Sequence, residues 1–177
     1  MLRQFKLRRY IMRACRRFAV LAIVLAAVLG LAGSGQESAQ AGGHSHLYVL
    51  LGLANMSPGL SEFGAEMSKR GVPTTVSNYM AWPQLASDAI SQYKKGRLRS
   101  IMIVGHSYGA DAGKAMAAAL GKAGVPVRLL VGIAATDGVK TPSNVRRSVN
   151  IVPEDDEGHF SVIAARKREL TRYVLGR

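Results

Sequence analysis

The segment GHSYG at positions 105–109 places Ser107 between two glycines in a G-x-S-x-G pattern. An apolar segment at 100–105 precedes it and an alanine-rich segment at 109–122 follows it, so we expect Ser107 at a strand-to-helix turn. In that context the pattern indicates a nucleophilic serine on a strained turn, with glycines where side chains would collide with neighbouring backbone. The start of the following helix adds partial positive charge where an oxyanion would form.

Together with an alternation of strands and helices and the late segment GHFSV at 158–162, this pattern resembles the α/β-hydrolase family over about residues 46 to 176. The resemblance implies a triad of nucleophile, acid and base in that chain order. Ser107 would be the nucleophile, and His159, just before the last expected helix, the base. Asp137 is the expected acid, since it follows the strand segment VGIAAT. Asp155 and Asp156 are the alternatives, since they follow the last expected strand.

The resemblance also implies an oxyanion hole made by the backbone N–H of Tyr108 and one from the loop after the first strand, at Leu53, Ala54 or Asn55. The implied function is hydrolysis of a small carboxylic ester or thioester through an acyl-enzyme on Ser107. This chemistry needs no metal and no organic cofactor. A second hypothesis stays open, in which the chain is a non-catalytic binding module on a hydrolase scaffold at the cell envelope.

Other polar residues near these positions have simpler explanations. We expect His106 to pack against or line the site, because neighbours at such a turn point in different directions. Asp111 falls in the first turn of a helix, where the helix dipole favours an acid. His44 and His46 have no carboxylate nearby in the sequence, so no metal site is predicted. The only cysteine, Cys15, excludes an intramolecular disulfide.

The remaining pattern predicts one α/β domain. Strands are expected at 46–53, 72–80, 100–105, 125–135 and 145–152, and helices at 58–71, 82–93, 109–122 and 160–174. Ser57 and Pro58 are expected to begin the first helix as its N-cap and first-turn proline. Continuous apolar strands alternating with helices predict a three-layer α/β/α domain with a mostly parallel sheet of about five strands. It would be a minimal hydrolase fold without the first antiparallel strands or a lid.

The first 41 residues are expected to be an export segment and not part of the domain. Seven basic residues precede an uncharged apolar run at 18–33, and the small-residue exit Ala39-Gln40-Ala41 follows. This organisation is typical of a secretory signal cleaved after Ala41, of ordinary length if translation starts at Met12 instead of Met1. The alternative is an uncleaved anchor, with 18–33 in the inner membrane and the domain outside. A linker at 42–45 would join it to the domain at 46–177.

The net charge of +13 over 177 residues would ordinarily suggest a nucleic-acid partner. Before residue 42, however, seven basic residues stand against the single acid Glu37, and in the rest of the chain 17 stand against 10. Nearly half of the net charge therefore belongs to the export segment. The basic residues of the domain are dispersed, so no nucleic-acid partner is predicted, and the expected location is periplasmic, secreted or membrane-anchored.

Overall fold

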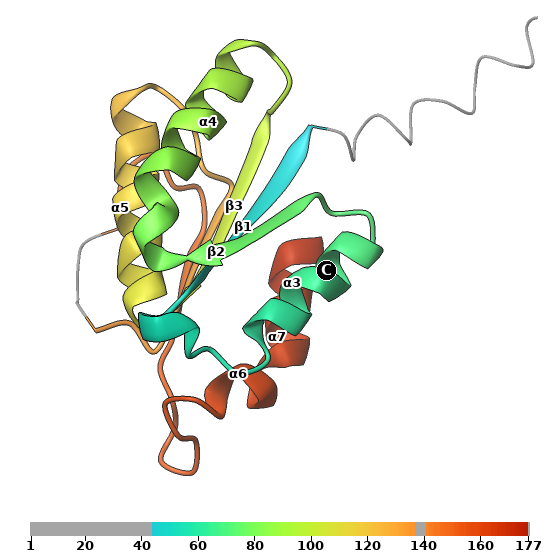
Figure 1. Ribbon diagram of the computed structural model, residues 1–177, viewed down its shortest axis with the longest axis vertical. Coiled ribbons are helices and arrows are strands. Elements are labelled where there is room, and N and C mark those ends of the chain that lie inside the picture. The colour runs from blue at the N-terminus through green and yellow to red at the C-terminus, as the bar shows by residue number, and fades with distance from the viewer. Residues whose placement is uncertain (1–43, 137–140, 177) are drawn as a thin grey trace, which may run out of the picture. The chain divides into compact units, whose positions relative to one another are not determined.

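Five parallel strands form the central sheet of the computed structural model, which describes residues 44–136 and 141–176 (Figure 1). The strands lie in the order β2-β1-β3-β4-β5, and every neighbouring pair is parallel. Their bounds are β1 (Ser45–Leu51), β2 (Thr74–Asn78), β3 (Ser100–His106), β4 (Leu129–Ile133) and β5 (Ser148–Ile151). The predicted α/β domain with a parallel five-stranded sheet is confirmed.

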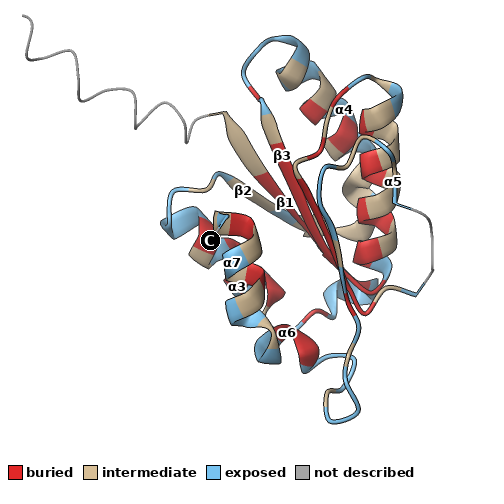
Figure 2. Ribbon diagram, turned by 180° about the vertical axis from the view of Figure 1, so that it is seen from behind, coloured by how far each residue is buried: buried red, intermediate tan, exposed pale blue. Residues whose placement is uncertain are grey.

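Helices cover both faces of this sheet, as predicted (Figures 1 and 2). On one face lie α3 (Leu60–Lys69), α6 (Val162–Ala165) and α7 (Lys167–Leu175), and on the other α4 (Trp82–Lys94) and α5 (Tyr108–Lys122). Two short 3₁₀ helices, η1 (Leu53–Asn55) and η2 (Tyr79–Ala81), follow β1 and β2. Because every neighbouring pair of strands is parallel, all five strands end on the same side of the domain.

The apolar run of β1 is continuous because both of its faces are buried. Leu47 and Val49 belong to the core beneath α3 and α7, whereas Tyr48 and Leu50 belong to the core beneath α4 and α5. Successive side chains of a strand point to opposite faces, so alternate residues supply the two cores. Strand β1, which leads into the loop beside the candidate site, is thereby held by packing on both of its faces.

Several expected element bounds need correction. The strands expected at 72–80 and 125–135 are shorter, and the helix expected at 160–174 is divided into α6 and α7 at Arg166. Phe160, the first residue of that expected helix, lies before α6 and is 43% exposed. The helix expected at 82–93 is confirmed as α4, with Trp82 and Tyr93 partly buried against its core.

The prediction for Ser57 and Pro58 was wrong. The helix begins at Leu60, and its N-cap is Gly59, whose φ of +84° suits a residue without a Cβ. Ser57 is buried instead, and its hydroxyl accepts a hydrogen bond from the backbone N–H of Gly52 at 2.9 Å. The serine thus closes the loop after β1 and does not cap the helix.

The predicted export segment and most of the linker lie outside the described residues, which begin at position 44. Within the part of the chain that is described, none of the helices is both long enough and apolar enough to cross a membrane.

Candidate active site

Ser107 lies at the turn from β3 into α5, as predicted. Its backbone angles are φ 56° and ψ −127°, in a region that residues with a side chain rarely adopt. Such a conformation costs about 1–3 kcal/mol and persists only where the surrounding structure imposes it. The Ser107 N–H donates to the Ile133 carbonyl at 2.8 Å, which holds the turn against the end of β4.

Two glycines make this turn sterically possible. A Cβ placed on Gly105 would lie 2.1 Å from the carbonyl oxygen of Gly109. A Cβ placed on Gly109 would lie 2.1 Å from the carbonyl oxygen of Leu50 in β1. Both neighbours are backbone atoms, which cannot rotate away as a side chain would. The two glycines of the G-x-S-x-G pattern are therefore required by close backbone approach.

The loop after β1 lies against the same turn. A Cβ on Gly52 would be 3.2 Å from the His106 carbonyl oxygen and 3.3 Å from Ser107 Cβ. Ala54 has a φ of 52° and Asn55 a φ of 62°, so the loop contains two strained residues. The Asn55 N–H donates to the Gly52 carbonyl at 3.1 Å, so it is not free to bind an oxyanion.

The candidate oxyanion donors consequently reduce to three. Tyr108 begins α5, and Leu53 and Ala54 occupy the 3₁₀ helix of the loop that lies against the turn. The structure thus brings both predicted donor segments to the same edge of the sheet as Ser107. Their alignment on a substrate oxyanion stays a prediction.

His106 joins three segments at this edge. Its ring is fully buried, and its Nε2 lies 2.8 Å from the His159 carbonyl oxygen, which can only accept. Nε2 therefore carries the proton, and Nδ1 accepts from the Ser57 hydroxyl at 3.0 Å. The packing role predicted for His106 is confirmed, but the bridge from the β1 loop to the His159 loop was missed. Nothing in the local sequence indicates it.

Burial lowers the pKa of His106 below its ordinary value of 6.5. The unfolded chain would take up a proton as the pH falls past about 6.5 while the folded protein does not, so folding stability decreases with falling pH in that range.

We expect the free energy of unfolding to fall between neutral and mildly acid pH, and to fall less in His106→Gln. Urea unfolding above and below pH 6.5 measures this. His46, whose pKa is also lowered by burial, contributes in the same direction, so His46→Gln is the matched variant. An unchanged pH dependence in His106→Gln would contradict the assignment.

His159 lies beside His106, on the loop before α6. Its ring centroid is 4.8 Å from that of His106 and 5.0 Å from that of Phe160. The residue is exposed, and its imidazole makes no hydrogen bond to another described residue. The structure therefore brings the predicted base to the edge that carries Ser107, and its role as a base stays a prediction. Catalytic hydrogen bonds are often long in unliganded proteins and shorten when substrate binds.

The identity of the acid is not fixed by the fold. Asp137 lies outside the described residues and directly follows Thr136, the last described residue after β4. Asp155 and Asp156 lie in an exposed turn, and neither is hydrogen-bonded to His159 within the residues described. All three aspartates remain candidates for the residue that orients His159.

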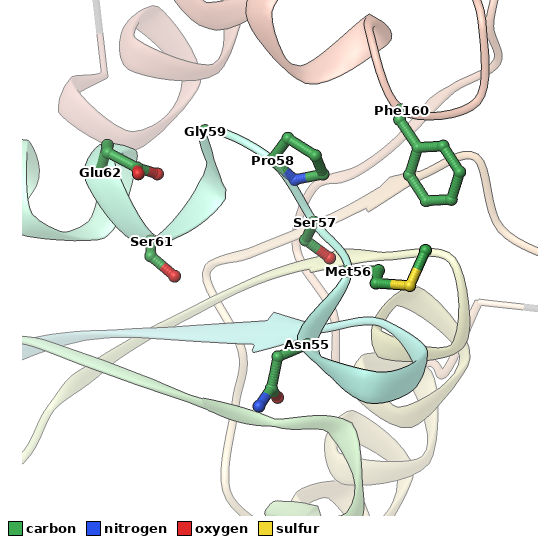
Figure 3. Close-up of a pocket in the computed structure, with 8 residues that line it drawn as sticks. All are labelled: Asn55, Met56, Ser57, Pro58, Gly59, Ser61, Glu62 and Phe160. Atoms are coloured by element: carbon green, nitrogen blue, oxygen red, sulfur yellow. The ribbon is translucent and has the colours of Figure 1, made fainter.

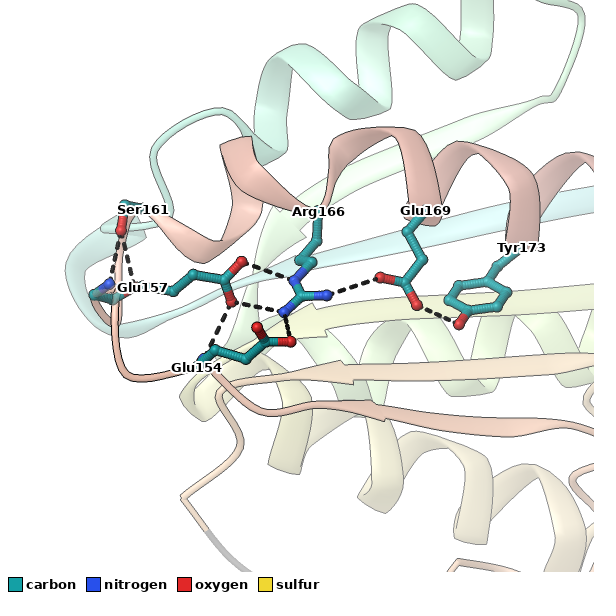
Figure 4. Close-up of polar contacts among 7 residues, drawn as sticks. Glu154, Glu157, Ser161, Arg166, Glu169 and Tyr173 are labelled. Atoms are coloured by element: carbon teal, nitrogen blue, oxygen red, sulfur yellow. Dashed lines mark hydrogen bonds and ion pairs between the residues drawn. The ribbon is translucent and has the colours of Figure 1, made fainter.

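The turn that carries Asp155 and Asp156 is held by an ion-pair network that the sequence did not reveal (Figure 4). Arg166 Nε donates to Glu157 at 2.8 Å, its Nη2 binds Glu154, and its Nη1 lies 3.7 Å from Glu169. Hydrogen bonds to Glu157 and Glu154 raise the pKa of Arg166, and the hydrogen bond from Arg166 lowers the pKa of Glu157. Two of the four acids at 154–157, Glu154 and Glu157, therefore fix the loop before His159.

Asp111 also makes hydrogen bonds outside its own helix. Its carboxylate accepts hydrogen bonds from the backbone N–H of Thr136, at 3.3 Å, and from the Thr136 hydroxyl. Lys114 lies 3.4 Å from the same carboxylate group. Asp111 therefore joins the first turn of α5 to the segment after β4.

A pocket of about 380 Å³ lies beside the loop after β1 (Figure 3). Its lining residues come from that loop, the start of α3 and the loop before α6: Asn55, Met56, Ser57, Pro58, Gly59, Ser61, Glu62 and Phe160. Ser107 is not among them, so the pocket adjoins the candidate nucleophile and does not contain it. The connection runs through Ser57, whose hydroxyl binds His106.

Large apolar side chains are exposed around this edge of the sheet. Leu53 is 57% exposed, Met56 55%, Tyr108 48% and Phe160 43%. Tyr108 also contacts Tyr79, with ring centroids 5.6 Å apart. Exposed apolar side chains gathered beside a strained serine are more typical of a ligand-binding edge than of a solvated surface.

Within residues 44–136 and 141–176, no three His, Cys, Asp or Glu side chains come together to hold a metal ion. His46 binds the Thr75 hydroxyl at 2.8 Å. A comparison with models of protein families gave no match, and a comparison with curated proteins gave none either.

Proposed function

We propose that this chain is a serine hydrolase of the α/β-hydrolase type, acting on carboxylic esters or thioesters. The observation that carries the proposal is the backbone of Ser107 at the β3–α5 turn, with φ 56° and ψ −127°. Gly105 and Gly109 permit this conformation, because a Cβ at either position would collide with backbone atoms. A strained serine at the carboxyl end of a central parallel strand is the arrangement of a nucleophile elbow.

In the proposed reaction, the Ser107 hydroxyl oxygen attacks the substrate carbonyl carbon while His159 takes the hydroxyl proton. The Tyr108 N–H, with that of Leu53 or Ala54, stabilises the negative charge on the carbonyl oxygen. Collapse of the tetrahedral intermediate expels the alcohol or thiol, which receives the proton from His159. Water, deprotonated by His159, then attacks the acyl carbon, and the bond to the Ser107 oxygen breaks as His159 returns the proton to that oxygen, which releases the acid.

Support for this assignment comes from the position of the proposed catalytic residues, which all lie at the carboxyl ends of the parallel strands. Ser107, the loop with Leu53 and Ala54, and His159 come from three distant parts of the sequence, and His106 contacts the second and third of these segments. The pocket beside the loop and the exposed apolar side chains around it suit a small acyl ester or thioester. Export through residues 1–41 would place this activity outside the cytoplasm.

The test is covalent labelling of the chain with a fluorophosphonate, which reacts with activated serines. We expect the native chain to be labelled and Ser107→Ala to remain unlabelled. Ser61→Ala is the matched control, because Ser61 is an exposed serine lining the nearby pocket, and it should be labelled like the native chain. A folded native chain that does not react would overturn the proposal.

One observation favours a second function, a non-catalytic binding module on this scaffold. The imidazole of His159 is exposed and has no hydrogen-bonded partner among the described residues, whereas an operating triad holds its base in place. In that case the apolar side chains around Ser107 would bind a ligand without reaction. A chain that resists labelling yet binds a small ester reversibly would support this function.

A further inference from the structure

We propose that the end of the domain opposite Ser107 is a docking surface for an anionic phospholipid bilayer. The surface, called here the basic end, consists of Lys94, Lys95, Arg97, Arg99 and Lys122. All five side chains are exposed. This inference goes beyond the proposed function and does not depend on catalysis by Ser107.

The five cations of the basic end have no carboxylate partners among the described residues, in contrast to Arg70, Arg166 and Lys167. Arg70 and Lys167 both pair with Glu66, at 2.6 and 2.8 Å, and Arg166 pairs with three glutamates. No carboxylate of the described residues lies within ion-pair distance of any member of the basic end. Their charge is therefore available to an external anion.

The basic residues of the domain are dispersed along the sequence, but the fold gathers these five at one end of the sheet. The last turn of α4 carries Lys94, the last turn of α5 carries Lys122, and the turn through Gly96, whose φ is +71°, leads into β3. In Figure 1 the last turns of α4 and α5 lie at the same end of the domain as the start of β1. The seven residues of β3 separate this end from the Ser107 turn by about 20 Å.

The chain joins the domain at the basic end. The His44 carbonyl accepts hydrogen bonds from the Arg99 N–H at 2.7 Å and the Ser100 N–H at 3.0 Å. Residues 1–43, which precede this point in the sequence, include seven more basic residues and the apolar run 18–33. The described part of the chain therefore begins at the same end of the domain as the five cations.

The opposite end has the charge that an anionic membrane repels. Asp155 and Asp156 are exposed there, in the turn before His159, together with Glu62 at the start of α3. A bilayer with negative charge would therefore attract one end of the domain and disfavour the other. The resulting orientation leaves Ser107 facing away from the membrane and accessible to a water-soluble substrate.

A nucleic acid would fit the basic end less well than a bilayer does. Binding of single strands uses exposed aromatic side chains for stacking between the cations. The one aromatic residue beside this cluster, Tyr93, is partly buried against the core of α4 and α5, and Leu98 within the cluster is also buried. The surface offers charge without a stacking platform, which suits lipid headgroups.

The test uses the full chain with Cys15→Ser and one new cysteine that carries an environment-sensitive dye. Gln92→Cys places the dye at the basic end, and Met80→Cys places it at the Ser107 end, where Met80 is 72% exposed. Vesicles of phosphatidylcholine, with or without phosphatidylglycerol, carry a headgroup quencher. We expect phosphatidylglycerol to increase quenching several-fold at position 92, and much less at position 80.

The double variant Lys95→Gln/Arg97→Gln should weaken this phosphatidylglycerol-dependent quenching about tenfold or more, since each cation near an anionic surface contributes to binding. Lys167→Gln/Arg168→Gln on α7 removes the same amount of charge elsewhere and should leave the phosphatidylglycerol-dependent quenching nearly unchanged. All variants keep the same residues 1–14 and 16–43, so that segment contributes equally. Stronger quenching at position 80, quenching that ignores phosphatidylglycerol, or equal losses in both double variants would overturn the proposal. An oligonucleotide that binds the basic end more tightly than the anionic vesicles would also overturn it.

Discussion

Gly109→Ala is expected to abolish folding of the domain or to leave it marginally stable. The new methyl group would lie 2.1 Å from the Leu50 carbonyl oxygen, 2.7 Å from its carbonyl carbon and 2.9 Å from the Leu51 carbonyl oxygen. All three atoms belong to the backbone of β1, which is buried on both faces and paired with β2 and β3. Relief would require α5 to move off the sheet. We expect a loss above about 4 kcal/mol, from a total of about 5–15 kcal/mol for a typical domain.

Gly113→Ala provides the matched control within α5. Its methyl group would meet only side-chain atoms, Ile103 Cγ2 at 3.1 Å and Leu130 Cδ1 at 3.4 Å, and alanine favours a helix interior by up to about 1 kcal/mol over glycine. We expect its stability to stay within about 1 kcal/mol of the native chain. Urea unfolding followed by circular dichroism compares the two. A Gly109→Ala chain as stable as Gly113→Ala would show that α5 does not approach β1 this closely.

The sequence was sufficient to predict the sheet and the serine turn because both depend on local patterns. Apolar runs such as the one at 46–51 follow from burial on two faces, and the helices between them force parallel pairing. The glycines at 105 and 109 indicate a close backbone approach, and the structure confirms it, because a Cβ added at either position would lie 2.1 Å from a backbone oxygen. Such signals stand within a few residues of the feature that they predict.

The contacts that hold the site together are long-range, and the sequence did not predict them. Ser57 carried the signal of a helix N-cap, yet its hydroxyl binds His106, 49 positions away. Arg166 begins a run of three basic residues in the sequence, yet it binds Glu157 and Glu154 in the loop that carries His159. Local preference for capping or for solvent cannot reveal these partners, because the tertiary fold decides which polar groups become buried together.

The acid of the proposed triad is best identified by three matched variants, Asp137→Asn, Asp155→Asn and Asp156→Asn. We expect Asp137→Asn to lower kcat about 10³- to 10⁴-fold, because the amide no longer stabilises the protonated imidazole or its tautomer. The other two variants should retain nearly native kcat. The end of β4 supports this expectation: the Ile133 carbonyl accepts the Ser107 N–H at 2.8 Å, so Asp137 follows the strand next to the nucleophile by four positions.

A pH profile separates an acid that acts through His159 from a residue needed only for folding. Loss of the true acid should change the pH dependence of kcat/KM, because the imidazole loses the carboxylate that favours its charged form. A merely structural defect would reduce the amount of active protein and leave the profile unchanged. A large loss in Asp155→Asn or Asp156→Asn, with Asp137→Asn unaffected, would assign the acid to the turn after β5. That turn is fixed by Arg166, so its aspartates would then reach His159 from a loop held in place by the ion pairs to Glu154 and Glu157.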